Sequence, residues 1–358
     1  MRAFEFAAWR SWVVFGPRAA RERLVEAMEE VDAQRVLVLA APPEADLARE
    51  LCAPLGANVV GIHTDVRPHV PIASAEAARE AAADHGADTL LSIGGGSTTG
   101  TAKAVALTTG LPIVAVPTTY AGSEATPVYG LTDAGRKTTG SDPRVVPRVI
   151  VYDPELTITL PAGLSGTSGL NALAHCAEAF WGPRANPVSS VLAEEGIHAL
   201  GRSLPRVVDD PGDVDARSDA LYGAWLSGTV FAQAGSGMHH KICHVLGGAY
   251  DLPHAELHSV VLPYAVAALA PDHPDADARI AAALGAPDGT PAADAIVALS
   301  RRLGAPSALR AIGLTGDSLE EATGLVAEHV AMDRGDVAEL LGAALEGAPP
   351  MALTRSTR

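Results

Sequence analysis

The sequence predicts an α/β fold in its first half, built on a mainly parallel sheet, followed by an all-helical second half. Three observations support this prediction. Short β-branched segments alternate with Ala-rich segments at the start, strand-like patterning nearly disappears later, and 358 residues exceed the size of a single hydrophobic core. We therefore expect two domains, residues 1–160 and 161–358.

Apolar segments mark the strands of the first half. They occupy residues 35–40, 57–62, 88–96 and 111–119, and the segment 74–86 between them has a helical pattern. Near-continuous apolar strands are typical of a parallel sheet that helices cover on both faces. Beyond residue 128, the letters DAG at 133–135 indicate a hairpin turn between Thr-rich strands.

Pro-containing breaks precede the helical half, and the domain boundary is expected near Leu160. Three later segments have helical patterns, and each is predicted to end near a glycine: 189–204, 276–285 and 294–304. No internal repeat or low-complexity segment accompanies them.

Charge and composition exclude several classes of function. The formal net charge is −16 and no run of Lys or Arg interrupts it, so a nucleic-acid partner lacks its usual electrostatic footprint. The three cysteines show no CxxC spacing, which argues against a disulfide framework or a zinc knuckle. The N-terminus is too polar for a signal peptide, and no stretch approaches the ~20 apolar residues of a membrane span. We expect a soluble cytoplasmic protein.

A glycine-rich turn lies where a predicted strand passes into a predicted helix, in LLSIGGGSTTGTAKAVAL at 90–107. Glycines let backbone N–H groups approach a phosphate, and Ser97 and Thr98 are predicted to cap the helix with their hydroxyls. A dinucleotide pyrophosphate suits this turn. A tight turn without ligand has the same pattern, and the spacing is neither G-x-G-x-x-G nor a Walker A motif.

Hydroxyl side chains follow the next strand in VPTTYAGSEATP at 116–127. They belong to Thr118, Thr119, Tyr120 and Ser123. Open α/β sheets bind ligands at the carboxyl ends of their strands, so these residues are predicted to line the same ligand site as the glycine turn.

Histidines gather in the helical half. Asn171 and His175 lie four residues apart on one helix face, and so do His240 and His244. His254 is expected in a loop beyond Gly247 and Gly248. These side chains can converge on one metal or one substrate. By spacing alone, His239 and His258 are expected to be ordinary core or surface residues.

Five ordered motifs together resemble the iron-containing alcohol dehydrogenase family, and specifically its maleylacetate reductase branch. They are GGGSTTGTAK, PTTYAGSEATPVYGLT, DPELTITLP, SGLNALAHCAEAFW and MHHKICHVLGGAYDLPHAELHSVVLP. The resemblance implies an α/β NAD(P)-binding domain and an all-α catalytic domain, an architecture that dehydroquinate synthase shares. It also implies a homodimer.

The resemblance also assigns cofactor residues. It implies that NADH or NADPH binds with its pyrophosphate on Gly95, Gly96, Ser97 and Thr98. Thr118, Thr119 and nearby positions line the adenosine and ribose path, and Lys137 falls where the family places a lysine near the cofactor.

Metal-dependent members use an Asp where this chain has Asn171, together with residues corresponding to His175, His240 and His254. A neutral amide holds a hard divalent cation more weakly than a carboxylate does. Gly100 also stands where those members carry an Asp. We expect a reaction without metal; if a metal binds, its ligands are the three histidines.

The implied reaction is NAD(P)H-dependent reduction of the C=C bond of maleylacetate, or a substituted maleylacetate, to 3-oxoadipate in aromatic catabolism. The substrate is a small anion. The predicted catalytic residues are His240, His244, His254, Lys241, Asn171 and His175. The spacing leaves open which histidine donates the proton. Alternatives are a metal-dependent alcohol dehydrogenase or ketone reductase of the same family and a non-enzymatic nucleotide-binding protein.

Overall fold

The computed structural model describes residues 4–133 and 136–351 and divides into two compact units. The first comprises Ala7–Leu160, and the second begins at Pro161. The few described residues before Ala7 group with the second unit. Among the described residues, no helix is long and apolar enough to cross a membrane.

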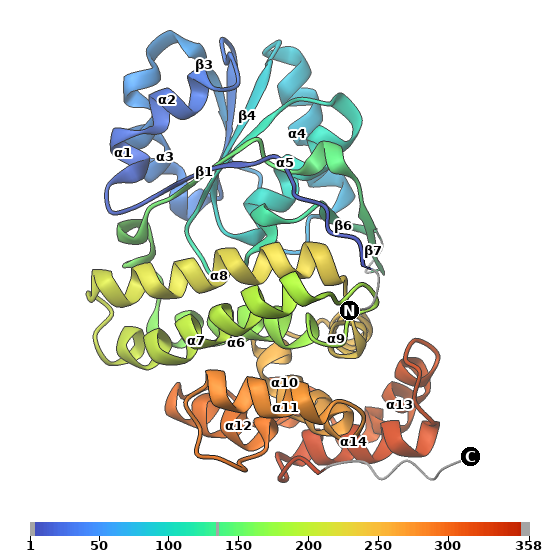
Figure 1. Cartoon of the computed structure of the whole chain (residues 1–358). Coiled ribbons are helices and arrows are strands. Elements are labelled where there is room, and N and C mark those ends of the chain that lie inside the picture. The colour runs from blue at the N-terminus through green and yellow to red at the C-terminus, as the bar shows by residue number, and fades with distance from the viewer. Residues whose placement is uncertain (1–3, 134–135, 352–358) are drawn as a thin grey trace. The chain divides into compact units, whose positions relative to one another are not determined.

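The first unit is built on a six-stranded parallel sheet with strand order β1-β8-β5-β4-β2-β3 (Figure 1). Its strands are β1 (Trp12–Phe15), β2 (Val36–Leu39), β3 (Val59–His63), β4 (Thr89–Gly94), β5 (Ile113–Pro117) and β8 (Val149–Tyr152). Its longer helices are α2 (Leu24–Glu29), α3 (Ala45–Cys52), α4 (Ile72–Asp84) and α5 (Gly96–Thr109), preceded by α1 (Ala19–Glu22). The predicted α/β fold with a mainly parallel sheet is confirmed. The sequence analysis did not predict β1 and β8.

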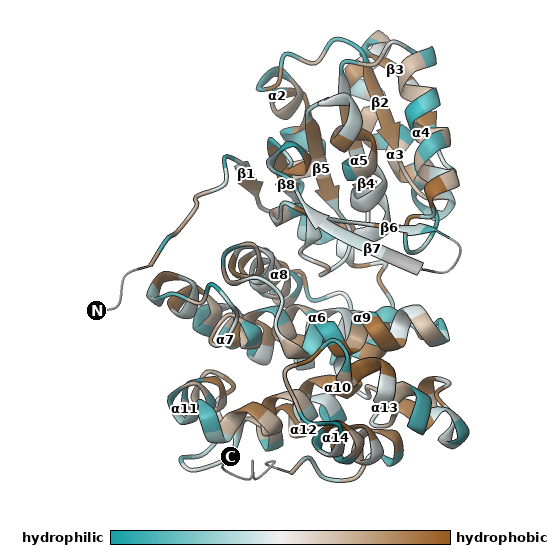
Figure 2. Ribbon diagram, turned by 90° about the vertical axis from the view of Figure 1, so that its right-hand side faces the viewer, coloured by the Kyte–Doolittle hydropathy of each residue, from teal (hydrophilic) through white to brown (hydrophobic). Residues whose placement is uncertain are grey.

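Alternate residues of the strands pack against opposite layers of helices. In β2, Val36 and Val38 belong to the core beneath α1–α3, whereas Leu37 and Leu39 belong to the core beneath α4 and α5. Because both faces are covered, the strands need apolar residues throughout, and β2 and β5 are brown along their length in Figure 2.

The strand order places a ligand crevice between two particular strands. The chain leaves β2 toward β3 on one side, and it leaves β4 toward β5 on the other side. Adjacent strands whose connections diverge open a crevice outside their carboxyl ends. The turn after β4 holds Gly95 and Gly96, so the glycine turn lies at this switch point.

A separate antiparallel hairpin extends the first unit, formed by β6 (Val128–Asp133) and β7 (Arg136–Ser141). It is paler than the sheet strands in Figure 2, as its Thr and Gly content predicts. The two Thr-rich strands flank the predicted DAG turn, of which Asp133 ends β6 and residues 134–135 lie outside the described residues.

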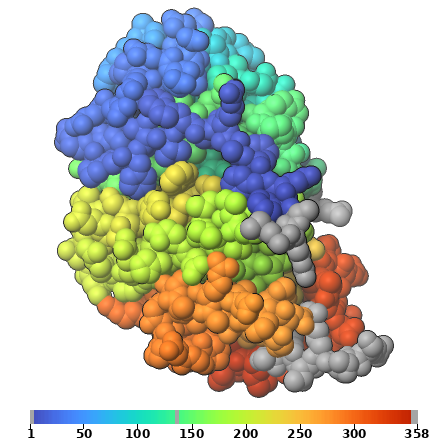
Figure 3. Space-filling view, viewed as in Figure 1, coloured from blue at the N-terminus to red at the C-terminus, as the bar shows by residue number. Residues whose placement is uncertain are grey.

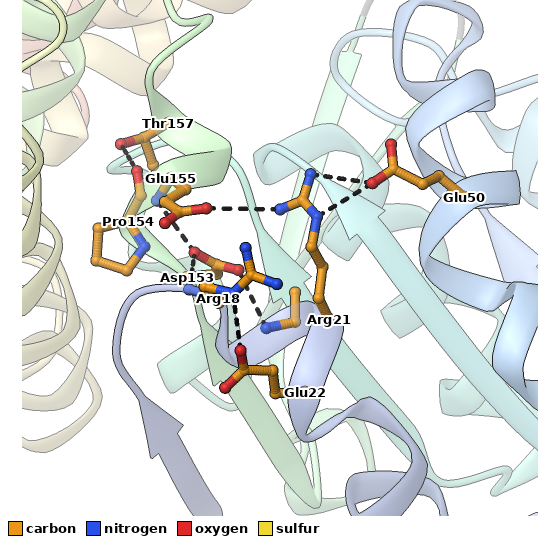
Figure 4. A network of polar contacts seen from close by, with 9 residues as sticks. Arg18, Arg21, Glu22, Glu50, Asp153, Pro154, Glu155 and Thr157 are labelled. Carbon is orange, nitrogen blue, oxygen red and sulfur yellow. Dashed lines mark hydrogen bonds and ion pairs between the residues drawn. The ribbon is translucent and has the colours of Figure 1, made fainter.

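Polar contacts fasten the end of β8 to the first helices (Figure 4). Asp153, directly after β8, accepts a hydrogen bond from the backbone N–H of Arg18 at 3.1 Å. Arg21 of α1 forms ion pairs with Glu50 of α3 at 3.0 Å and with Glu155 at 3.8 Å. These contacts hold the carboxyl end of β8 in place against α1 and α3.

The second unit is helical throughout its described elements, as predicted. They include α6 (Ala162–Glu178), α7 (Pro187–Asp209), α8 (Val214–Ala234), α9 (Met238–Tyr250), α10 (His254–Leu269), α11 (Pro274–Ala283), α12 (Ala292–Arg302), α13 (Leu319–Ala327) and α14 (Arg334–Glu346). Helices α7 and α8 pack side by side along their length (Figure 1), and their yellow-green and yellow atoms adjoin in the space-filling view (Figure 3).

One predicted helix end is wrong. The helix expected at 189–204, with its end near Gly201, is α7, which continues through Gly201 and Pro205 to Asp209. A Cβ at Gly201 would lie 3.1 Å from Leu284, so this glycine allows α7 to approach the end of α11 rather than ending the helix. Tertiary packing therefore overrides the local signal of Gly201 and Pro205.

Candidate functional site

The glycine turn joins β4 to α5. Gly95 is the N-cap of α5, and no side chain caps this 14-residue helix. The prediction that Ser97 and Thr98 cap it is therefore wrong. Both lie inside the first turn, whereas a capping side chain belongs to the N-cap residue. Because Gly95 has no side chain, the first N–H groups of the helix are left to a ligand.

The glycines let the turn after β4 approach the side chains of the turn after β5 closely. A Cβ at Gly95 would lie 2.9 Å from Thr119, and one at Gly96 would lie 3.2 Å from Ala121. The Ser123 hydroxyl lies 3.8 Å from that Gly96 position and is buried without a hydrogen-bond partner. An uncapped helix N-terminus beside an unsatisfied hydroxyl fits an anion such as a pyrophosphate.

The predicted hydroxyl residues after β5 separate into two groups. Thr118, whose N–H donates to Gly94, leads into the turn that carries the partly exposed Thr119 and Ser123. Tyr120 is fully buried, and its hydroxyl lies 3.5 Å from Thr157 Oγ1, so its ring packs in the core. Lys137 belongs to β7, but its side chain lies outside the described residues.

Lys103 of α5 is a buried cation that the sequence analysis missed. Its ammonium donates hydrogen bonds to the carbonyl oxygens of Ser123 (2.6 Å), Thr126 (2.7 Å) and Val128 (2.7 Å), and lies 3.0 Å from Thr126 Oγ1. Burial lowers the pKa of Lys103 to about 7, while nearby Glu124 opposes that change. The signal was a single lysine among small and apolar residues of one helix.

In the helical unit, Asn171 and His175 share one face of α6, whose second half is entirely buried. Asn171 Oδ1 and His175 Nδ1 are buried without hydrogen-bond partners. Burial lowers the pKa of His175 well below its usual range, and the neighbouring histidines lower it further. His175 is therefore neutral near pH 7.

The remaining predicted residues lie on α9 and α10. His240 is buried, His244 is partly exposed and Lys241 is exposed. His254 does not lie in a loop beyond two glycines, and that prediction is wrong. Gly247 and Gly248 belong to α9, the connecting loop is 251–253, and His254 is the first residue of α10.

The structure brings the histidines into one cluster around His240 and His258. His240 stacks on His175 with ring centroids 4.8 Å apart, and its ring centroid lies 4.7 Å from that of His258. His239 lies 4.9 Å and His254 4.2 Å from His258, whereas His244 lies 5.9 Å from His240.

His258 occupies the interior of this cluster. It is fully buried, and neither ring nitrogen has a hydrogen-bond partner. Burial lowers the pKa of His258, and the neighbouring histidines lower it further. Burial also lowers the pKa of His239, while Glu178 and the hydrogen bond to His258 oppose that change. Spacing alone predicted ordinary roles for both residues, because it does not show that α10 packs beside α9.

Glu178, at the end of α6, is a second residue that the sequence analysis missed. Its carboxylate Oε2 lies 2.5 Å from His240 Nδ1, and burial raises its pKa while contacts with His239 and the α9 backbone lower it. The signal was an acidic residue three positions after His175 in an apolar helix.

The residues that correspond to the family's metal ligands share the histidine cluster, but among the described residues their ligand atoms do not form one close group. Among the described residues, one group of three ligand atoms lies within 4.8 Å of one another, and it comprises His239, His240 and His258. It includes neither His175 nor His254, and Asn171 supplies no carboxylate. The side chains present do not fit the family's metal site.

Two family models match this chain. Residues 11–154 match the model described as iron-containing alcohol dehydrogenase, and residues 165–343 match the model of that family's C-terminal part. The chain belongs to the iron-containing alcohol dehydrogenase family. This member therefore combines the family's two halves in the family's usual order.

Several relatives are similar over nearly the full length of this family member. It is 45% identical to a maleylacetate reductase from Burkholderia cepacia, over 98% of this chain and 100% of that one. It is 45% identical to a maleylacetate reductase from Sphingobium indicum, over 95% of this chain and 96% of that one.

Solved structures of the iron-containing alcohol dehydrogenase family share the fold. The maleylacetate reductase from Rhizobium sp. strain MTP-10005 superimposes with a TM-score of 0.92 at 42% identity, over 98% of this chain and 100% of that chain. A putative alcohol dehydrogenase from Ralstonia eutropha JMP134 gives 0.95 at 48% identity, with the same coverage.

Proposed function

We propose that this protein is an oxidoreductase that reduces the carbon–carbon double bond of maleylacetate, or of a substituted maleylacetate, to 3-oxoadipate in aromatic catabolism. Identity of 45% to maleylacetate reductases over nearly the whole chain supports this proposal. The main observation in its favour is the kind of side chain found at the positions that correspond to the family's metal ligands. A neutral amide, Asn171, accompanies neutral buried histidines where a metal-dependent relative has a carboxylate.

The proposed cofactor is NADH or NADPH. The first turn of α5, entered through Gly95 and Gly96, would hold the pyrophosphate together with the hydroxyl of Ser123. Thr118 and Thr119 would line the continuation of this site after β5. When bound, the cofactor supplies a hydride to one alkene carbon of the substrate.

The chain's own residues must complete the reduction. Hydride addition to the alkene, which is conjugated with a ketone, leaves an enolate that needs a hydrogen-bond donor at oxygen and a proton at the neighbouring carbon. His240, with His244 beside it, is proposed to donate, and Asn171 and His175 are proposed to orient the substrate. Exposed Lys241 and His254 are proposed to attract its carboxylates.

This substrate needs less activation than a simple ketone does. A metal polarises a carbonyl as a Lewis acid, whereas an enone flanked by a carboxylate is already electrophilic. Hydrogen-bond donors then suffice to stabilise the enolate. We therefore propose a reaction without metal, and a cytoplasmic homodimer as the working form.

The test combines metal analysis of the purified protein with NADH oxidation by maleylacetate before and after chelation. We expect turnover that survives the chelator, because the one close group of three ligand atoms found among the described residues is His239, His240 and His258, which contains no carboxylate. Stoichiometric metal with chelator-sensitive activity on a simple aldehyde would instead identify a metal-dependent alcohol dehydrogenase. Nucleotide binding without turnover of either substrate would indicate a non-enzymatic binding protein.

A further inference from the structure

Glu178 is the last residue of α6, and its carboxylate lies beside the first turn of α9. Its side chain is 1% exposed, and Oε1 accepts a hydrogen bond from the backbone N–H of His240 at 3.3 Å. A Cβ at Gly237 would lie 2.7 Å from Oε1, so the glycine at the N-cap of α9 is what lets the carboxylate approach. An anion at this position satisfies N–H groups of the first helical turn.

The second oxygen of the same carboxylate contacts the His240 ring. Oε2 lies 2.5 Å from Nδ1, while His175 stacks on the ring and Phe231 packs against it with centroids 4.7 Å apart. Because Oε1 is held by the α9 backbone, Oε2 has a fixed position. The carboxylate thus meets one edge of the ring, while His175 stacks on the ring and Phe231 packs against it at a tilt of 40°.

His239 provides a contrast within the same helical turn. Its Nε2 lies 3.0 Å from the backbone carbonyl of His258, so it is oriented by a neutral backbone acceptor. A hydrogen bond to an ionised acceptor is about twice as strong as one to a neutral acceptor. Glu178 therefore contacts the ring of His240 directly, whereas it acts on the ring of His239 only through its charge.

We propose that Glu178 is a positioning residue that holds the Nδ1–H of His240, so that Nε2 is the nitrogen that delivers the proton. This inference rests on the proposed function. The hydride that bound NADH or NADPH would supply, on oxidation to NAD⁺ or NADP⁺, forms the first new C–H bond, and the π electrons of the alkene shift into the enolate. The Nε2–H proton then forms the second C–H bond and restores the ketone. The Nδ1–H stays with Glu178, and Nε2 regains a proton from solvent.

The experiment compares wild type with Glu178→Gln. A glutamine oxygen still accepts the N–H groups of α9, but it lacks the charge that holds Nδ1–H. We expect kcat with maleylacetate to fall at least about 100-fold, with an unchanged KM for the nicotinamide cofactor. Exposed Glu195 of α7, changed to Gln, is the matched control and should keep wild-type kcat. Wild-type kcat in Glu178→Gln would reduce Glu178 to a helix cap and overturn the proposal.

A second measurement does not depend on turnover or on the Glu178→Gln variant. Imidazole ¹⁵N spectra of wild-type protein labelled at histidine, assigned with His240→Asn, report which ring nitrogen carries the proton. We expect Nδ1 to be protonated. An Nδ1 without a proton overturns the positioning role. If wild type shows the expected spectrum but does not reduce maleylacetate, the proposed function fails while the role of Glu178 stands.

Discussion

Asn171 is the residue on which the proposed chemistry depends most. Its side chain is buried on the same face of α6 as His175, and its oxygen has no hydrogen-bond partner. A carboxylate there would be a buried charge one helical turn from His175, which burial keeps neutral. The amide avoids that cost, at the loss of an anionic ligand for a cation.

Asn171→Asp should therefore make the fold depend on a cation. We expect a destabilisation of about 2 kcal/mol or more, because the new carboxylate is buried without a counter-charge. Added Zn²⁺ or Fe²⁺ should restore part of the lost stability by pairing with Asp and His175. Thermal unfolding with and without metal checks this expectation. Asn171→Leu is the control, and an equal response to metal in both variants would contradict the explanation.

Helix α5 and the segment after β5 form the proposed cofactor site, and Lys103 ties these two elements together. Three carbonyl oxygens of residues 123–128 accept hydrogen bonds from its ammonium. Each buried acceptor would lose its partner if the ammonium were removed. The position of Ser123 beside Gly96 thus depends on a residue that does not itself face the ligand.

Lys103→Met should weaken both the fold and cofactor binding. We expect a loss of about 3 kcal/mol of unfolding free energy from the unsatisfied carbonyls. We also expect a KM for NADH raised about tenfold, because the segment carrying Ser123 is released. Urea unfolding and steady-state kinetics measure the two effects. Exposed Arg49 of α3, changed to Met, serves as control. A destabilised variant with an unchanged KM would show that Lys103 supports the fold alone.

In helix α9, two glycines led to the wrong prediction of a loop. Gly247 and Gly248 suggested a loop, but the helix continues through them to Tyr250. A Cβ at Gly247 would lie 3.3 Å from Leu257, so the missing side chain permits close packing of α9 on α10. Burial of Leu246 and Leu257 offsets the roughly 1 kcal/mol that a helical glycine costs.

At the scale of the whole molecule, charge opposes the proposed substrate. The formal net charge is −16, and burial holds His175, His239 and His258 in their neutral forms near pH 7. A dianionic substrate therefore approaches a repulsive field, which dissolved salt screens over a Debye length of about 8 Å at physiological ionic strength.

Raising NaCl from about 0.01 M to about 0.15 M should therefore increase kcat/KM for maleylacetate about two- to threefold. Initial rates at low substrate concentration, with saturating cofactor, measure this effect. Titration with a neutral osmolyte in place of salt is the control. A kcat/KM that falls with salt would show that local cations, such as exposed Lys241, outweigh the net charge.

The sequence by itself determined the fold class and the residues that follow each strand. The spacing of hydrophobic residues and the residue composition are local signals. Neighbouring residues therefore sufficed to predict β2–β5, the glycine turn and the helical character of the second unit. The same holds for the family and for the Asn at position 171, because both depend on ordered motifs along the chain.

Only the tertiary structure decided which distant side chains meet. Glu178 reaches His240 across 62 positions of sequence, and His258 is buried beside His239 because α10 packs on α9. Lys103 donates hydrogen bonds to backbone carbonyls 20 to 25 residues away in the sequence. Such contacts depend on long-range packing and on the cost of burying unsatisfied polar groups, and no local pattern encodes either of them.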